Sequence, residues 1–89
     1  ITHDAERQRY SVLIDGVEAY LTYETPSPSI RHITHTIVPK SIGGRGLGQR
    51  LVTRAVEDAI MTNAQQISSS CWFATKLIDK NPDWKKHLA

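Results

Sequence analysis

The alternation of hydrophobic and polar residues predicts strands in the first part of the chain. Residues 9–15 and 17–24 alternate, and Asp15-Gly16 between them is a typical turn dipeptide of a β-hairpin. The β-branched stretch 30–38 predicts a third strand, which Pro39 ends. Residues 25–29, with two prolines and two serines, predict the connecting loop.

The spacing of apolar residues changes after the third strand and predicts a long helix. From residue 47 to about residue 63 they recur every three to five positions, at Leu47, Leu51, Val52, Ala55, Val56, Ala59 and Ile60. Residues 66–73 predict a fourth strand and residues 75–80 a short helix. Asn81-Pro82 predicts the cap and first position of another helix.

These elements give the order β-β-β-α-β-α and predict one α/β (α+β) domain covering residues 1–89. The third and fourth strands with the helix between them form a βαβ unit, which we expect to be parallel and right-handed. The first three strands form an antiparallel meander, so the sheet is mixed. No stretch approaches the roughly 18 apolar residues that a membrane span needs, and no signal-peptide pattern opens the sequence.

Composition and charge narrow the class of partner. A single cysteine, Cys71, excludes an internal disulfide and a multi-cysteine zinc site, and we expect a cytoplasmic location. The net charge of +2 is too small to predict binding to a long polyanion such as nucleic acid. A partner with a few phosphates fits the local basic clusters better. These are Lys40, Arg45, Arg50 and Arg54 around the glycines, and Lys76, Lys80, Lys85 and Lys86 near the C-terminal end.

Four glycines fall between residues 43 and 48, at the predicted junction of strand and helix. Amides at the start of a helix lack intrahelical partners, and glycine lets an anion approach the backbone closely. The pattern therefore predicts a phosphate site, with a flexible strand-to-helix turn as the alternative. A P-loop is excluded because Gln49-Arg50 follows the last glycine. A dinucleotide fingerprint is excluded because the next strand, "ISSSCW", ends without an acid.

The stretch "VPKSIGGRGLGQRLV" after a strand resembles motif A of the GNAT acetyltransferase superfamily, the loop that holds the pyrophosphate of acetyl-CoA. The segments "HT-x-VP" and "SCWFATKLIDKNPDW" resemble one compact branch, the single-domain YjdJ-like or NATD-like N-acetyltransferases. The resemblance implies a minimal GNAT-like mixed sheet. It also implies transfer of an acetyl group from acetyl-CoA, as cosubstrate, to an amine acceptor.

The resemblance also implies roles for particular residues. The backbone of Ile37 and Val38 would pair with the pantetheine arm, and Cys71 would lie near the thioester. The pyrophosphate would be held by the amides of residues 43–48, with added charge from the arginine, that is by Gly43, Gly44, Arg45, Gly46, Leu47 and Gly48. Lys76 or Lys80 would reach the 3′-phosphate of coenzyme A.

Three departures from the family pattern bear on catalysis. Gly43 stands where larger members carry Gln or Arg, and Ile37 stands where this branch commonly has an acid. No tyrosine follows Cys71 to protonate the leaving thiolate.

Two side chains are candidates for the chemistry. His35 is the first candidate base, because the strand that carries it leads into the cofactor loop, with a space-filling sheet histidine as the alternative. His32 is weaker, since odd spacing on a strand places it on the opposite face, and this also argues against a metal site. For Cys71, three interpretations stay open: a buried hydrophobe, an acyl-carrying nucleophile, or the thiol that reprotonates the leaving group.

Three hypotheses of function result. The first is an acetyltransferase whose acceptor side is open, which favours a large amine such as a protein, or a pocket completed by a second subunit in a homodimer. The second is a non-catalytic module that binds coenzyme A or acyl-CoA. The third, a nucleic-acid-binding domain, requires aromatic and basic residues interleaved on a sheet face, and the N-terminal strands lack that pattern.

Overall fold

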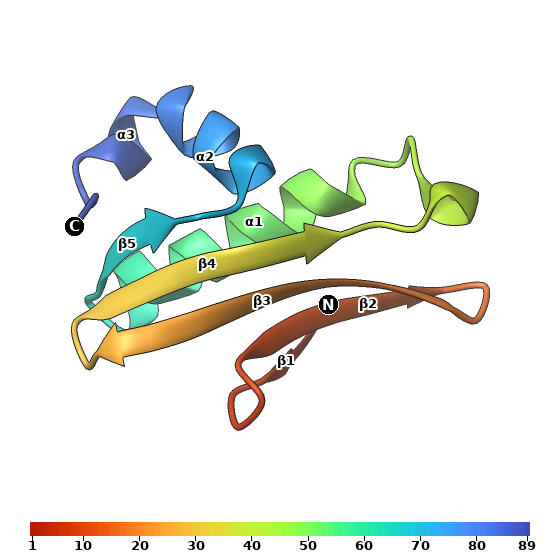
Figure 1. Cartoon of the computed structure of the whole chain (residues 1–89), viewed down its shortest axis with the longest axis horizontal. Helices are drawn as coiled ribbons and strands as arrows, with labels where there is room; N and C mark the ends of the chain where they lie inside the picture. Colours follow the sequence, from red (N-terminus) through yellow and green to blue (C-terminus); the bar gives the residue numbers. More distant parts are fainter.

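Five strands form one sheet in the computed structural model, which describes residues 1–89 (Figure 1). They are β1 (Thr2–Asp4), β2 (Arg9–Ile14), β3 (Val17–Ser27), β4 (Ile30–Ile37) and β5 (Gln66–Ser69), and they lie side by side in chain order. β1 to β4 pair antiparallel, and β5 pairs parallel with β4. The predicted hairpin, the parallel βαβ unit and the mixed α+β class are therefore confirmed.

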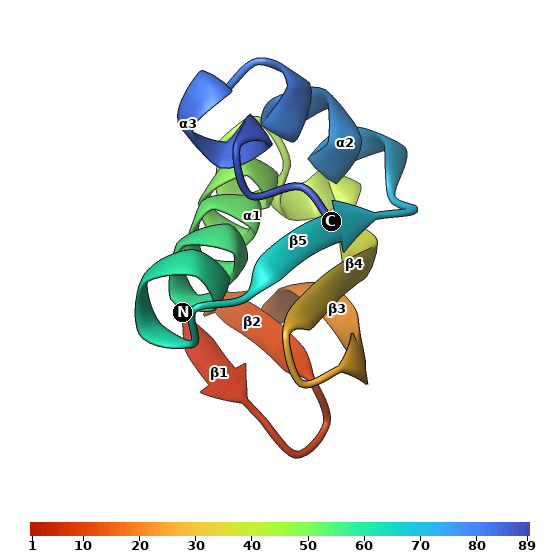
Figure 2. The same ribbon diagram turned by 90° about the vertical axis from the view of Figure 1, so that its left-hand side faces the viewer.

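The helices gather on one side of this sheet (Figure 2). α1 (Leu47–Glu57) continues into a π-helical segment, η2 (Asp58–Thr62), so the predicted helix 47–63 is confirmed. A 3-10 turn, η1 (Lys40–Ile42), precedes α1, and α2 (Trp72–Asp79) and α3 (Pro82–Lys85) follow β5. The core lies between α1 and the sheet and includes the fully buried side chains of Tyr10, Leu21, Ile33, Leu51, Val52, Val56 and Ile67.

The N-terminal half of the sheet is larger than predicted. Strand β1 was not predicted, and β3 runs to Ser27, through most of the expected loop 25–29. The last register pair of β2 with β3 joins Arg9 to Thr22, so the end of β3 pairs with β4 alone. Pro26 is tolerated there because a proline without an N–H disturbs no ladder on the free edge.

The segment around Cys71 also differs from the prediction. β5 ends at Ser69 and α2 begins at Trp72, so the predicted strand 66–73 is too long and the helix predicted at 75–80 starts three residues earlier. Cys71 itself is the N-cap residue of α2. The cap predicted for the last helix is confirmed, since Asn81 Oδ1 accepts hydrogen bonds from the amides of Asp83 and Trp84 at 3.1 and 3.3 Å.

A bulge in β4 changes the face that its histidines occupy. Thr22 pairs with His35 and Glu24 pairs with His32, although the two β4 residues are three positions apart. Residues 22 and 24 share one face of β3, so both histidines point to the sheet face that carries no helix. The expectation that His32 and His35 lie on opposite faces is therefore wrong. No group of metal-ligating side chains forms around them.

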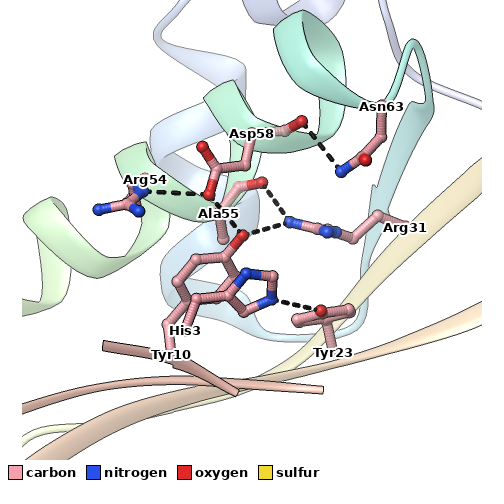
Figure 3. A network of polar contacts seen from close by, with 8 residues as sticks. All are labelled: His3, Tyr10, Tyr23, Arg31, Arg54, Ala55, Asp58 and Asn63. Atoms are coloured by element: carbon pink, nitrogen blue, oxygen red, sulfur yellow. Dashed lines mark hydrogen bonds and ion pairs between the residues drawn. The ribbon is translucent and has the colours of Figure 1, made fainter. Parts of the chain in front are cut away.

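A buried arginine joins the sheet to α1 (Figure 3). Arg31 of β4 is only 4% exposed, and its Nη1 donates hydrogen bonds to the Tyr10 hydroxyl at 2.7 Å and to the Ala55 carbonyl at 3.0 Å. The Tyr10 hydroxyl donates to Asp58 Oδ2 at 2.8 Å, and Arg54 Nε donates to the same oxygen at 3.0 Å. The phenol thus links two opposite charges and fixes the far end of α1 against the sheet.

The titrating groups of this network have shifted pKa values. Burial and the hydrogen bond to Asp58 raise the pKa of Tyr10, so the phenol stays protonated. Burial alone would raise the pKa of Asp58, but the hydrogen bonds from Tyr10 and Arg54 outweigh it and hold that pKa below its ordinary value. His3 stacks on Tyr10 with ring centroids 4.0 Å apart, and burial followed by the charge of Arg31 lowers the pKa of His3.

Candidate functional site

The glycine loop runs from the end of β4 to the start of α1. After Pro39, the buried side chain of Ile42 anchors the 3-10 turn to the core, and the chain then crosses the four residues before Leu47. Gly44 and Gly46 have φ angles of +75° and +72°. These left-handed conformations suit glycine, and a Cβ at either position would meet nothing closer than 4.0 Å. The loop therefore turns into the helix with an open space above its backbone.

Six consecutive amides at this turn have no hydrogen-bond acceptor in the chain. The amide of Gly43 donates to the Lys40 carbonyl at 3.1 Å, and the amide of Arg50 donates to the Gly46 carbonyl at 3.1 Å. Between them, the amides from Gly44 to Gln49 make no hydrogen bond within the protein. The positive end of α1 lies at the same place. This is the arrangement that binds anions at helix N-termini, although Gly43, predicted as a donor, is already occupied.

A groove of about 550 Å³ lies over these amides. Its wall is formed by Val38, Lys40, Gly43, Gly44, Gly46, Leu47, Gly48, Gln49 and Phe73. Lys40 is the only charged residue of this wall. Arg45 and Lys76, which the sequence predicted as contacts, do not line it, and the Lys76 Nζ lies 5.9 Å from the centroid of the Trp72 ring. From the sequence, Lys40 is only one member of the basic cluster around the glycines.

A second hollow of about 220 Å³ continues the groove. It shares Val38, Gly48 and Phe73 with the first, and it adds Thr36 and Trp72. The glycine at position 48 makes this passage possible, because a Cβ there would lie 2.9 Å from Phe73 Cε2. Its role is thus to let the helix and the Phe73 ring approach each other, which the glycine count alone does not reveal.

β4 and β5 separate beside this second hollow. The last backbone hydrogen bond between the two chain segments runs from the Ser70 amide to the Ile33 carbonyl, at 3.0 Å. β4 continues to Ile37, whereas the chain after β5 turns away into α2 (Figure 1). The edge of β4 beyond Ile33 therefore faces a split in the sheet, with no strand beside it. Such a split offers free backbone groups to an extended ligand.

Cys71 lies at this split. It is 8% exposed, and its Sγ is 3.6 Å from the Thr36 hydroxyl, which lines the second hollow. Ser69 Oγ fixes the turn by accepting a hydrogen bond from the Cys71 amide at 3.1 Å and donating one to the Cys71 carbonyl at 3.0 Å. The thiol therefore lies beside Thr36, next to the second hollow, although Cys71 itself lines neither hollow.

The two histidines of β4 lie on the other face of the sheet. His35 is exposed and makes no side-chain hydrogen bond, and Ile37 beside it is 43% exposed. Each ring nitrogen of His32, by contrast, contacts a serine hydroxyl of the segment 68–70. No hydrogen bond joins His35 to Cys71, whose thiol contacts Thr36 on the helix side of the sheet, so the fold does not pair the two predicted catalytic side chains.

The groove, the glycine loop and the split all lie within the part of the chain that matches a known protein family. The family model described as GCN5-related N-acetyl-transferase matches residues 9–88. This chain belongs to the GCN5-related N-acetyltransferase family. Members of this family are acyltransferases, which generally use acetyl-CoA as the acetyl donor and an amine as the acceptor. The predicted family is thus confirmed, and the acceptor stays unnamed.

Individual relatives agree with this assignment. Protein NATD1 of Mus musculus is 31% identical over 84 residues, which cover 92% of this chain and 76% of the mouse protein. Protein NATD1 of Homo sapiens is 30% identical over 84 residues, covering 92% and 74%. A GCN5-like protein of Staphylococcus aureus, solved by NMR, superposes with a TM-score of 0.73 at 27% identity and covers 92% of this chain and 81% of that one. None of the helices is long and apolar enough to cross a membrane.

Proposed function

We propose that this chain transfers the acetyl group of acetyl-CoA to the amine of a large acceptor, such as a protein. The observation that carries the proposal is the row of six unoccupied amides at the N-terminus of α1. A diphosphate is the anion that suits several consecutive N–H donors. The groove over them continues to Thr36, whose hydroxyl contacts the Cys71 thiol at the split of the sheet.

The pyrophosphate would be held by the amides of Gly44, Arg45, Gly46, Leu47 and Gly48. Lys40 lines the groove and would add a positive charge to the pyrophosphate, in the role first predicted for Arg45. Because the Gly43 amide already donates to Lys40, the contribution of Gly43 would be the shape of the turn: a Cβ there would lie 3.3 Å from the Lys40 carbonyl oxygen.

The pantetheine arm would extend along the free edge of β4, past the backbone of Val38 and Ile37. From Val38 back to Ile33 the strand has five steps of about 3.3 Å, or roughly 17 Å in all. That length leads from the glycine loop to the point where β4 and β5 meet, beside Cys71. The thioester would therefore come to rest in the split, reachable from the helix-free face of the sheet.

The acceptor side supports a large substrate. None of the surface hollows is lined by Tyr20, His35 or Ile37, which occupy the open face near the split. A small amine would find no pocket there, whereas a protein brings its own surface to the sheet. If a second subunit builds the missing wall instead, sedimentation of the acetyl-CoA complex will give twice the monomer mass.

Calorimetric titration with coenzyme A tests the cofactor site. Gly46→Ala and Gly44→Ala should each weaken binding about 10- to 100-fold, the equivalent of losing one hydrogen bond to a charged group. Gly16→Ala is the matched control, because Gly16 also has a positive φ of +77°, has open space where a Cβ would be, and lies outside the groove. Equal affinities for the Gly46 and Gly16 variants would contradict the assignment.

Release of free coenzyme A from acetyl-CoA tests turnover. In the presence of lysine-containing peptides, the wild-type protein should release coenzyme A in step with peptide acetylation, measured by mass spectrometry. Cys71→Ala should slow this release while leaving calorimetric affinity within about threefold, because Cys71 does not line the groove over the amides. Tight binding without any release would instead support the non-catalytic module.

A further inference from the structure

His32 is held on both sides by serine hydroxyls of the neighbouring segment. Its Nδ1 lies 2.6 Å from Ser68 Oγ, and its Nε2 lies 3.1 Å from Ser70 Oγ. His32 and Ser68 are half-buried, whereas Ser70 is exposed. With the proton on Nδ1, the imidazole donates to Ser68, and Ser70 donates to the free Nε2. One serine thus orients the ring while the other connects it to solvent.

His32, Ser68 and Ser70 lie next to the place where β4 and β5 separate. The amide of Ser70 makes the last hydrogen bond between β5 and β4, and the next residue is Cys71. Ser70 therefore stands at the point where the sheet splits. Cys71 contacts Thr36 on the helix side of the split, while His32 and Ser70 lie on the helix-free side. An acceptor arriving from the open face meets Ser70 before it meets the thiol.

We propose that His32, acting through Ser70 and oriented by Ser68, accepts the proton of the acceptor amine. This assignment rests on the proposed acetyl transfer and replaces His35 as the base. His35 lies on the same face but is exposed and makes no side-chain hydrogen bond, to a hydroxyl or to the segment that ends at Cys71. Ser70 is then the catalytic residue that touches the acceptor, and Ser68 is a positioning residue.

The step balances without any further reactant. The lone pair of the amine forms the C–N bond to the thioester carbonyl carbon, and the C–S electron pair leaves on the coenzyme A sulfur. The proton lost by the amine passes to Ser70 Oγ as the Ser70 proton moves to His32 Nε2. The Cys71 thiol at the split gives its proton to the thiolate, which forms free coenzyme A. Cys71 then takes up a proton from solvent, and His32 returns the amine's proton to solvent, so no net proton is gained or lost.

Few other titratable groups lie near His32 on the helix-free face of the sheet. Glu24 is its register partner on β3 and is exposed, and His35 is the other titratable group of β4 on this face. The β5 neighbours, Ser68 and Gln66, are uncharged. Arg31 precedes His32 in sequence but points into the core on the helix side. A pH effect on transfer should therefore follow His32, with Glu24→Gln as the variant that measures the neighbouring charge.

The test compares the pH dependence of acetyl transfer in the wild type and in His32→Gln. We expect transfer to fall about 10²- to 10⁴-fold, with the acid limb of the rate profile lost and acetyl-CoA affinity unchanged within about twofold. Exogenous imidazole should restore transfer in His32→Ala without changing that affinity. His87→Gln is the control, because His87 lies in a separate hollow with Glu57 and Trp84. An unchanged profile in His32→Gln, or loss of the acid limb on removal of His35 instead, would overturn the assignment.

A second readout does not depend on the acceptor. Long-range ¹H–¹⁵N correlation spectra report which imidazole nitrogen carries the proton, and we expect Nδ1 in the wild type. In Ser68→Ala, that tautomer should lose its preference. If the wild-type protein binds acetyl-CoA but releases no coenzyme A, the proposed transfer fails. In that case the tautomer of His32 still tests whether Ser68 orients the ring. A proton on Nε2 would contradict that arrangement.

Discussion

Replacing Tyr10 by phenylalanine tests how α1 is held against the sheet. Tyr10→Phe removes one oxygen that accepts from Arg31 and donates to Asp58. Both lost hydrogen bonds involve a charged group, and such bonds contribute about 1.5–3 kcal/mol each. Arg31 keeps the Ala55 carbonyl and Asp58 keeps Arg54, so part of the loss is offset. We expect a decrease of about 2–4 kcal/mol in the free energy of unfolding.

Urea denaturation and thermal unfolding measure this loss. For a domain of this size, about 1 kcal/mol shifts the melting temperature by roughly 4–8 °C, so Tyr10→Phe should melt about 8 °C or more below the wild type. Tyr23→Phe is the matched control: it removes one hydrogen bond, to His3 at 2.7 Å, and keeps its ring over Arg31. We expect it to cost about 1 kcal/mol. Equal losses in the two variants would refute the view that the phenol links two charges.

Three further outcomes are expected. The pKa of His3 is lowered from 6.5 in the folded protein, so on acidification the unfolded chain takes up this proton first. The free energy of unfolding should therefore decrease as the pH drops below about 6.5. His3→Gln should flatten that decrease, measured by urea denaturation at several pH values. Gly48→Ala should weaken calorimetric acetyl-CoA affinity more than tenfold by pushing Phe73 into the groove, and a second change, Phe73→Leu, should restore part of it. Asn81→Ala should lower the free energy of unfolding by about 1 kcal/mol through loss of the α3 cap.

The sequence was sufficient for the parts of the fold that local patterns determine. The Asp15-Gly16 turn, the apolar stripe of α1 and the Asn81 cap each depend on neighbours within a few positions, and all three are confirmed. β1 was missed because three residues carry no periodicity. That strand is held by its pairing with β2, in which His3 is the register partner of Tyr10 and stacks on its ring.

Features that depend on packing between distant segments could not be predicted. The bulge at Thr34 places both histidines of β4 on one face, and nothing in the alternation of that strand indicates it. Trp72 and Phe73 have strand propensities, yet the separation of β5 from β4 carries them into α2. The glycines predicted an anion site. Only the three-dimensional structure shows that the Gly43 amide already donates to the Lys40 carbonyl and that Gly48 makes room for the Phe73 ring.

The central claim is that backbone amides at the start of α1 bind the diphosphate of coenzyme A. A titration followed by amide ¹H–¹⁵N spectra tests it most directly, using coenzyme A and, separately, inorganic pyrophosphate. We predict that the resonances of residues 44–49 shift the most and saturate together with both ligands, while the occupied amide of Gly43 moves less. Saturating coenzyme A that leaves these six amides in place and shifts another surface would contradict the account.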